Sequence, residues 1–540
     1  MTPSSLGLDL QEERSPDPII ARLGTARTAF VGRTLRGPVN RPILLNSFAE
    51  FQHIYGGLWQ PSPLGYAVEH FFDNGGREAL VVRVVNGART ATLALRAGAG
   101  RLTLQAVSPG TREFLRASVD YDNISAADSV RFNLTVQRVR IQGASHVEEQ
   151  EIFPNLSVDP ADERYVASVL ARSELAHLLG KVPAQRPDRT LDPGGLASAY
   201  VSSNADGDDG APVSDYDLIG SQIDRTGLFA LDRTDYFNLL CVPPLSRERD
   251  VGPSTLLVAA RYCRQRRALL IVDPPAVWHT ADEALRGLRE WDFASENALM
   301  YFPRILAQDR LRGHFESFAP CGAVAGMLAR SDEASPMWGA AKPEEAVLRP
   351  GYRPACLVVE ERRRQLALRG VNTLQAVRSV TRIGVKARTL AGGSAGAAEW
   401  QSLAARRLAL FILNCIEHGT RWVIGTQAHA QAAETITAQV RSFFMQLYEA
   451  GAFPGRRMEE AFFVICDRRN PAHGSAAGDE FRFLIGFAAA RPKEFHSFRI
   501  VHSAAGSKVE AVSINRLNLA EYCPEELLWV DKLAKELGPP

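Results

Sequence analysis

The sequence predicts a multidomain protein of mixed α/β (α+β) class. The chain has 540 residues, a length that suggests about three to four domains. Short apolar runs that end at proline pairs, Phe237–Val242 and Ala268–Val272, are typical of buried parallel strands, and a helical pattern lies between them. From Thr90 to about Gln142, short alternating runs are separated by Gly, Pro and Asn, which indicates an inserted β-rich domain.

The N-terminal region begins with a run of alternating polarity. Leu6, Leu8 and Leu10 recur with period two, which predicts a strand, and the turn-forming stretch Ser15–Pro18 follows. A strand at a chain end needs an edge to pair with. Taken alone, the pattern allows pairing within the chain or with another chain, and general experience with termini favours the first.

The next region alternates strands and helices that carry recognisable caps. Serine favours helix N-caps and glycine favours the residue after a helix. We expect, in order, a strand at Ala29–Gly32, a helix from Ser47 to Gly56-Gly57, a helix from Ser62 to Gly75-Gly76 and a strand at Leu80–Val85.

The last large region predicts two amphipathic helices followed by strands. Apolar residues recur at helical spacing from about Trp400 to His418 and from about Ala433 to Ala450. The expected strands are Phe462–Cys466, Phe483–Phe487 and Phe495–Val501.

Composition argues against several classes of function. A net charge of +1 disfavours nucleic acid as the main partner and does little to oppose self-association. The seven cysteines are scattered without a CxxC pair, which indicates free thiols in a reducing compartment. The eleven histidines form no cluster with the spacing of metal ligands. We therefore expect no metal and no cofactor.

Targeting signals are also missing from the sequence. The first ten residues have no basic start and no apolar core of signal-peptide length, and no apolar run reaches the roughly 18 residues that a membrane span needs. We expect a protein that is made and kept in the cytoplasm, whose later release would come by lysis, with no direct membrane insertion.

Three local motifs could carry chemistry, and each has a simpler structural interpretation. Gly392–Gly396 places Ser394 in a nucleophile-elbow pattern but lacks the apolar strand before it, so a loop is favoured. Asp206, Asp208 and Asp209 resemble a calcium loop in the wrong register, so a surface turn is favoured. Asp273 ends a strand, but no phosphate-binding loop accompanies it.

Two distant parts of the chain together resemble one protein family. The first part contains Arg27–Asn40, Ser47–Gly57, Ala67–Gly76 and Leu80–Val84, and the second contains Trp400, Arg406-Arg407, Gly451–Gly455, Phe463–Asp467 and Arg491–Phe495. Between them, Asp206–Tyr216, Gly227–Leu231, Ala319–Gly326 and Gly370–Asn372 follow in matching order. In this order the segments resemble the sheath protein of contractile phage tails and related contractile injection systems. The family often has Pro-Ser where Pro320-Cys321 stands, and residues 504–540 form a longer tail than the family implies.

The resemblance implies a sheath core built from the N- and C-terminal parts of the chain, with an inserted β-rich domain and extended terminal arms. The expected divisions are an N-terminal arm (1–20), the first part of the core (21–90), the β-rich insertion (91–200), an α/β middle domain (201–385), a tube-facing C-terminal core (386–503) and a C-terminal arm and tail (504–540).

The resemblance further implies a structural subunit and not an enzyme. Such a subunit would polymerise as stacked hexameric rings around an inner tube protein and contract to drive the tube through a target membrane. Its other partners would be baseplate and terminal cap proteins, with sheath paralogues as further candidates. The alternatives are an α/β hydrolase using Ser394 and a soluble multidomain binding module.

The resemblance also assigns candidate contact residues. Inter-subunit strand exchange would use Leu6, Leu8 and Leu10 at one end and Phe495, Phe498 and Ile500 at the other, with Val509–Ile514 as the fallback for the second strand. The expected inner-tube contacts are Arg406, Arg407, Arg456 and Arg457, for each of which a solvated or internally paired arginine is the simpler interpretation.

Overall fold

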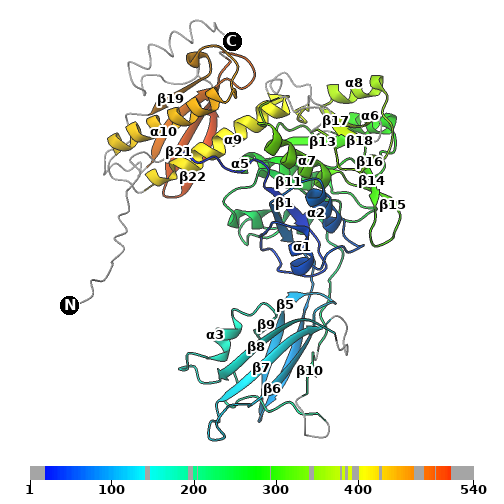
Figure 1. The fold of residues 1–540 in the computed structure, drawn as a ribbon, viewed down its shortest axis with the longest axis vertical. Coiled ribbons are helices and arrows are strands. Elements are labelled where there is room, and N and C mark those ends of the chain that lie inside the picture. The colour runs from blue at the N-terminus through cyan, green and yellow to red at the C-terminus, as the bar shows by residue number, and fades with distance from the viewer. Residues whose placement is uncertain are drawn as a thin grey trace, which may run out of the picture. The chain divides into compact units, whose positions relative to one another are not determined.

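The computed structural model describes residues 19–512 apart from 140–145, 193–198, 204, 292, 340–345, 378–379, 384–386, 392–399, 425–428, 467–479 and 493. The chain divides into two compact units (Figure 1). Unit 1 comprises Met1–Thr25, Pro336–Ala340 and Ser402–Pro540, and unit 2 comprises Ala26–Ser335 and Ala341–Gln401. Several sheets and many helices confirm the mixed α/β class.

An eight-stranded sheet forms the centre of unit 2. Its order is β18-β17-β13-β12-β11-β1-β3-β2, and its inner strands are parallel. The strands are β1 (Thr28–Gly32), β2 (Ile43–Leu45), β3 (Ala79–Arg83), β11 (Leu239–Cys241), β12 (Leu269–Val272), β13 (Ala298–Phe302), β17 (Val371–Val377) and β18 (Val380–Ile383). Strands from before and after the insertion therefore share one sheet, because β1 pairs with both β3 and β11.

The expected caps bound the first helix of unit 2, whereas the second helix has a different N-cap. The Ser47 side chain accepts a hydrogen bond from Glu50 N at the start of α1 (Phe48–Tyr55), and Gly56 ends that helix at φ 85°. In α2 (Leu64–Asp73) the cap position belongs to Pro63 and not to Ser62. Ser62 lies one residue earlier, and its hydroxyl accepts from Leu64 N.

Further helices complete the layers around this sheet. They are α4 (Asp215–Ile219), the 3₁₀ helix η1 (Gly227–Arg233), α5 (Pro253–Arg266), α6 (Ala281–Glu290), α7 (Cys321–Ala334) and α8 (Glu360–Leu368). A small antiparallel sheet joins β14 (Ile305–Gln308) to β15 (Phe315–Phe318) and β16 (Arg353–Pro354).

Helices α2 and α7 approach each other to backbone contact. A Cβ atom on Gly322 would lie 1.9 Å from Ala67 O, and one on Gly326 would lie 2.2 Å from Phe71 O. Only hydrogen fits at either position, so the two glycines set the distance between these helices.

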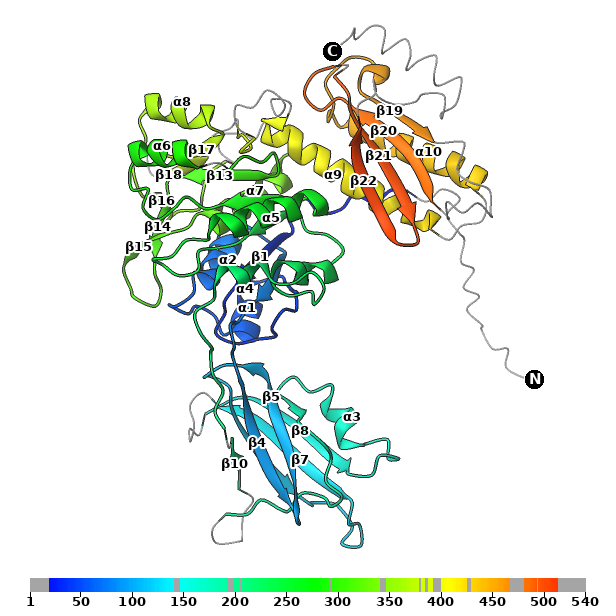
Figure 2. The ribbon, with the colours of Figure 1, turned by 180° about the vertical axis from the view of Figure 1, so that it is seen from behind.

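The inserted domain is a β-sandwich, as its alternating sequence predicts (Figure 2). One sheet has the order β10-β6-β7-β8 and the other β4-β5-β9, and their inward side chains form one core. The elements are β4 (Thr90–Ala97), β5 (Gly100–Pro109), β6 (Phe114–Asp120), β7 (Arg131–Val139), β8 (Val147–Ser157), α3 (Val166–Leu170), β9 (Ala176–Leu178) and β10 (Val201–Ser202).

Unit 1 packs two long helices with a four-stranded antiparallel meander. Its elements are α9 (Leu403–Thr420), η3 (Arg421–Val423), α10 (His429–Glu449), η4 (Met458–Glu460), β19 (Phe462–Cys466), β20 (Phe481–Phe487), β21 (His496–Ser503) and β22 (Gly506–Val512). Aromatic rings fill the space between α10 and the sheet, with Phe444 stacked on Phe462 at a centroid distance of 4.9 Å. The two predicted helices and three predicted strands are confirmed, and β22 overlaps the fallback segment Val509–Ile514.

Candidate functional site

The strand at the margin of the unit 1 sheet is β22. The sheet order is β19-β20-β21-β22, so β22 pairs with β21 on one side only, from Ser497↔Val512 to Ser503↔Gly506. Among the described residues its other side has no strand partner. A row of unpaired N–H and C=O groups on such an edge is a template for pairing with another chain.

Strand β21 is an inner strand, which corrects the expected position of the edge. It is hydrogen-bonded to β20 and to β22 of the same chain, so its backbone offers no free edge. Phe498 and Ile500 are buried in the core, and the Phe495 ring lies against Phe463 at 5.4 Å. The accessible strand lies in the fallback segment because the chain reverses at Gly506, whose φ is 122°.

A buried chain of hydrogen bonds holds β22 in place. Thr420 Oγ1 donates to Ile416 O at 2.6 Å, so it accepts from His502 Nε2 at 2.8 Å. The other ring nitrogen, Nδ1, then accepts from Ser507 Oγ at 2.7 Å. His502 is 1% exposed. Helix α9, inner strand β21 and edge strand β22 are thereby joined through one imidazole.

Charged side chains line the outer face of this edge. Lys508 Nζ lies 2.5 Å from Glu510 Oε1, and the bond from this ammonium holds the pKa of Glu510 below its usual range. Arg499 stands directly opposite Glu510 in the register of β21 and β22. Opposite charges across the pair favour this register.

The four candidate arginines fall into two pairs with different surroundings. Arg406 and Arg407 lie on α9 and are 7% and 8% exposed, and both have partners within the chain. Arg407 Nη2 donates to Thr25 O at 3.3 Å. Arg456 and Arg457 are exposed on the loop before η4. Only the second pair therefore presents its charge to solvent.

The acidic loop that resembles a calcium site is engaged by the chain itself. Asp208 accepts from Gly210 N at 2.7 Å and pairs with Arg89 at 3.0 Å, while Asp209 accepts from both the backbone and the hydroxyl of Thr111. In the part of the chain that the structure describes, no group of three His, Cys, Asp or Glu side chains could hold a metal ion. These bonds support the structural interpretation of the loop.

The remaining chemical candidates contribute little to a site. Burial raises the pKa of Asp273 to about 6, and its Oδ1 accepts from Cys321 N at 2.9 Å, so this carboxyl caps α7. Ser394 and the Leu6–Leu10 run lie outside the described residues. No helix in the described ranges is long and apolar enough to cross a membrane.

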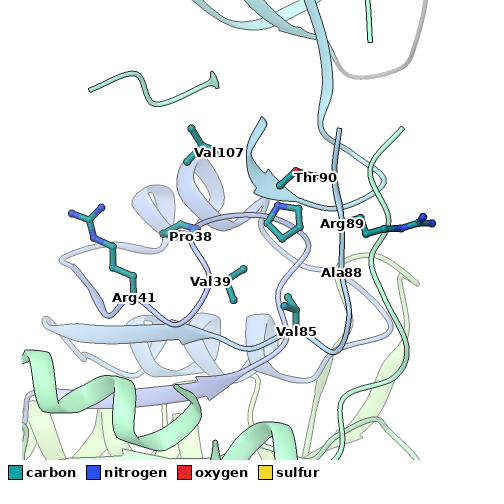
Figure 3. A pocket seen from close by; sticks show the side chains of 9 residues that line it. Pro38, Val39, Arg41, Val85, Ala88, Arg89, Thr90 and Val107 are labelled. Carbon is teal, nitrogen blue, oxygen red and sulfur yellow. The ribbon is translucent and has the colours of Figure 1, made fainter. Parts of the chain in front are cut away.

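The junction of the β-sandwich with the rest of unit 2 holds a buried arginine, Arg83, and an open pocket, which Figure 3 shows. Arg83 is 1% exposed and donates to Gly37 O and Pro109 O at 2.7 Å each, and burial lowers its pKa to about 10. The pocket, of about 650 Å³, is lined by Pro38, Val39, Arg41, Val85, Ala88, Arg89, Thr90, Val107 and Pro109. Arg41 and Arg89 extend away from each other, so the two charged side chains that line the pocket do not converge on one ligand position.

Comparison with known proteins identifies the fold. No family model and no curated protein matches the sequence. Among solved structures, the sheath tail protein of Listeria innocua matches with a TM-score of 0.56 at 12% identity, over 91% of this chain and 95% of that one. The sheath tail protein of Desulfitobacterium hafniense matches with a TM-score of 0.52 at 13% identity, over 94% and 99%. The contracted sheath complex of the extracellular contractile injection system PVC matches with a TM-score of 0.50 at 15% identity, over 92% and 96%. The chain thus has the fold of contractile tail sheath proteins along almost its whole length.

Proposed function

We propose that this protein is the structural subunit of a contractile sheath, in a phage tail or a contractile injection system. The observation that carries the proposal is the likeness in fold to sheath proteins over more than nine-tenths of the chain. In this role the protein works through interfaces and not through catalysis. Its subunits stack as hexameric rings around an inner tube, and contraction drives the tube through a target membrane.

Strand addition at β22 is the contact that we propose between subunits. The edge is regular, has one free side among the described residues and is tied to α9 through His502. Leu6–Glu13 has the alternating pattern of a strand that a neighbouring copy could add there. Because donor and acceptor are different surfaces, the contact propagates into an open helix and does not close into a dimer.

The proposed partners follow from this role. They are further copies of the chain, an inner tube protein, and the baseplate and cap proteins that end the assembly. Arg456 and Arg457 are the exposed arginines of the original four and are our candidates for a weak ionic contact with an acidic tube. Exposed ion pairs are weak and screened by salt, which suits a surface that must release the tube.

Electron microscopy of the purified protein tests the proposal directly. Wild-type protein should form wide hollow tubes, and a variant lacking Met1–Ser15 should remain folded but fail to form them. Uniform monomers from the wild-type chain would contradict the sheath function and favour a binding module or an enzyme. Long tubes from the truncated chain would contradict the role of the N-terminal strand.

The tube contact has its own test. Replacing Arg456 and Arg457 with glutamate should weaken co-sedimentation with an acidic inner tube at low salt while leaving sheath-only assembly unchanged. The same replacements at Arg261 and Arg264, exposed on α5, provide a matched control. Equal binding by both double variants would remove Arg456 and Arg457 from the interface.

A further inference from the structure

A short segment just before β1 is fastened along α9, and we call residues 19–25 the strap. Leu23 N donates to Cys415 Sγ at 3.3 Å, and Arg407 Nη2 donates to Thr25 O at 3.3 Å. Ile20 is 3% exposed and lies beside Gly419. The strap therefore contacts α9 near its beginning, past its middle and at its end, and both views show this segment beside the helix (Figure 1, Figure 2).

The order of the contacts shows how the strap runs. As strap residue numbers fall from Thr25 to Ile20, helix residue numbers rise from Arg407 to Gly419, so the two run antiparallel. Twelve helical residues span about 18 Å, and five extended residues span about 17 Å. Positions 407, 415 and 419 also share one stripe of the helix, because they are separated by multiples of four. An extended strap thus fits one face of α9 without slack.

Ile20, the buried side chain of the strap, packs against Gly419 of α9. A Cβ atom there would lie 2.9 Å from Ile20 Cγ1 and 3.0 Å from Ile20 Cγ2. The adjacent Ile19 is 74% exposed, so the strap has a distinct inner and outer side. A side chain at position 419 would displace Ile20 and lift the strap at its N-terminal end.

We propose that the strap is an anchor, which stays bound to α9 throughout assembly and contraction. It would transmit force from the N-terminal residues through unit 1 to β22, and we call this route the load path. This inference rests on the proposed sheath function, in which residues 1–18 are held by a neighbouring subunit. Pull on those residues passes from Ile20 and Leu23 to α9. From α9 it passes through the Thr420–His502–Ser507 bonds to β22, which is the proposed acceptor for the next subunit.

The consequence is that donor arm and acceptor edge are coupled inside one unit. Both the strap and β22 belong to unit 1, whereas the eight-stranded sheet and the β-sandwich belong to unit 2. Tension between subunits is then carried along α9 and its sheet, and unit 2 is not part of the path. Ile20 and Gly419 are positioning residues for this path.

Two variants and one control test the anchor. Ile20→Asp and Gly419→Leu should release the strap, and Ile19→Asp should not, because its side chain is already in solvent. Hydrogen exchange of the amides at residues 20–25 should accelerate at least tenfold in the first two variants and stay unchanged in the control. Tubes from the first two variants should be several-fold shorter and break on dilution, while Ile19→Asp tubes match the wild type.

A disulfide that holds the strap on α9 provides the opposite test to the variants that release it. The backbone N of Leu23 lies 3.3 Å from Cys415 Sγ, so Leu23→Cys is the variant to test for a disulfide with the native Cys415, and a disulfide closed by mild oxidation would keep the strap on α9. Because the anchor stays docked throughout, the locked protein should assemble and contract like the wild type. Failure of the locked protein to assemble would show that the strap must leave α9, which would overturn the proposal.

The outcomes separate this proposal from the proposed function. If the wild-type chain forms no tubes, the sheath function is wrong and the load path falls with it. If wild-type tubes form and Ile20→Asp tubes have the same length and strength despite a released strap, the load path alone is wrong.

Discussion

Two sheets in this molecule end in long exposed strands, and the two edges are built differently. Strand β8 closes one sheet of the β-sandwich and β22 closes the sheet of unit 1. Strand β8 contains Pro154 and pairs with β7 through two register irregularities. Strand β22 contains no proline and pairs with β21 in continuous register. Proline and bulges make an edge a poor template for another strand.

Charged side chains occur on both edges, and on both they are engaged by the same chain. Three glutamates lie on β8, and each is engaged by the same chain: Glu148 by Arg36 at 2.9 Å, Glu149 by Arg138 at 2.8 Å, and Glu151 by Glu174 N at 3.0 Å. On β22 the one acidic residue, Glu510, pairs with its own strand neighbour Lys508. Edge exposure alone therefore does not identify an assembly surface. An edge without proline and in continuous register, as in β22, is a better candidate than an edge like that of β8.

The largest effect should come from protecting the open edge. Neighbouring residues of a strand turn their N–H groups to opposite sides, so Lys508→Pro and Val509→Pro remove different donors. One of them removes an outward donor, and it should raise the concentration needed for assembly about a hundredfold while sparing the fold. Sedimentation and circular dichroism measure both properties. Assembly by both proline variants at wild-type concentrations would refute the role of β22.

The second-largest effect should come from a substitution at Glu69 that changes the stability of unit 2 without changing assembly through β22. Burial raises the pKa of Glu69 to about 7, against the opposing influence of Arg310. The folded state therefore binds this proton more tightly than the unfolded state, and stability falls as pH rises from about 4.5 to above 7. Glu69→Gln should stabilise unit 2 by about 2 kcal/mol at pH 8 and remove this part of the pH dependence.

Thermal unfolding at pH 5 and pH 8 gives the measurement for Glu69→Gln. The exposed Glu163→Gln serves as the control. Assembly should be unchanged in both variants, because β22 belongs to unit 1. If assembly changed together with the stability of unit 2, residues of unit 2 would also take part in assembly, and not the edge of β22 alone.

A smaller effect should come from loosening the open edge. Thr420→Val leaves His502 Nε2 without its acceptor, and an unsatisfied buried donor costs about 1–2 kcal/mol. In this variant we expect hydrogen exchange to accelerate more in β22 than in β19, and assembly to weaken modestly. Thr435→Val is the matched control, because the hydroxyl of Thr435 on α10 likewise donates to the carbonyl four residues earlier, Gln431 O. Unchanged exchange in β22 would show that the imidazole does not hold the edge.

The smallest effect should come from removing protection on β8. Pro154→Val restores a backbone donor and a strand-forming side chain, and the concentration of protein that stays soluble should fall a few-fold. The aggregates should differ from sheath tubes by electron microscopy. Ordered tubes with a new diameter would instead mean that β8 is a second assembly edge.

Local patterns predicted much of the fold and less of the candidate site. Ser47 and Gly56 bound α1 as expected, because capping depends on residues only a few positions apart. The free edge lies on β22, which overlaps the fallback segment Val509–Ile514 and not the first choice Phe495–Val501, and the small residues around Gly506 could have indicated the turn between them. The burial of Arg406 and Arg407 and the bonding of Thr420 to His502 depend on contacts between distant segments, which periodicity does not report.

The backbone contact between α2 and α7 has an evolutionary consequence. The solved structures share the fold at 12 to 15% identity, so most positions tolerate replacement as long as their polarity and size fit. Gly322 and Gly326 cannot drift in this way, because a methyl group at either would overlap a carbonyl of α2. Replacement there requires the helices to move apart, and with them the strands that they cover. In a chain that keeps its fold while its sequence changes, these two positions should be among the slowest to vary. The restriction would come from the close packing of two helices and not from a chemical role of the residues.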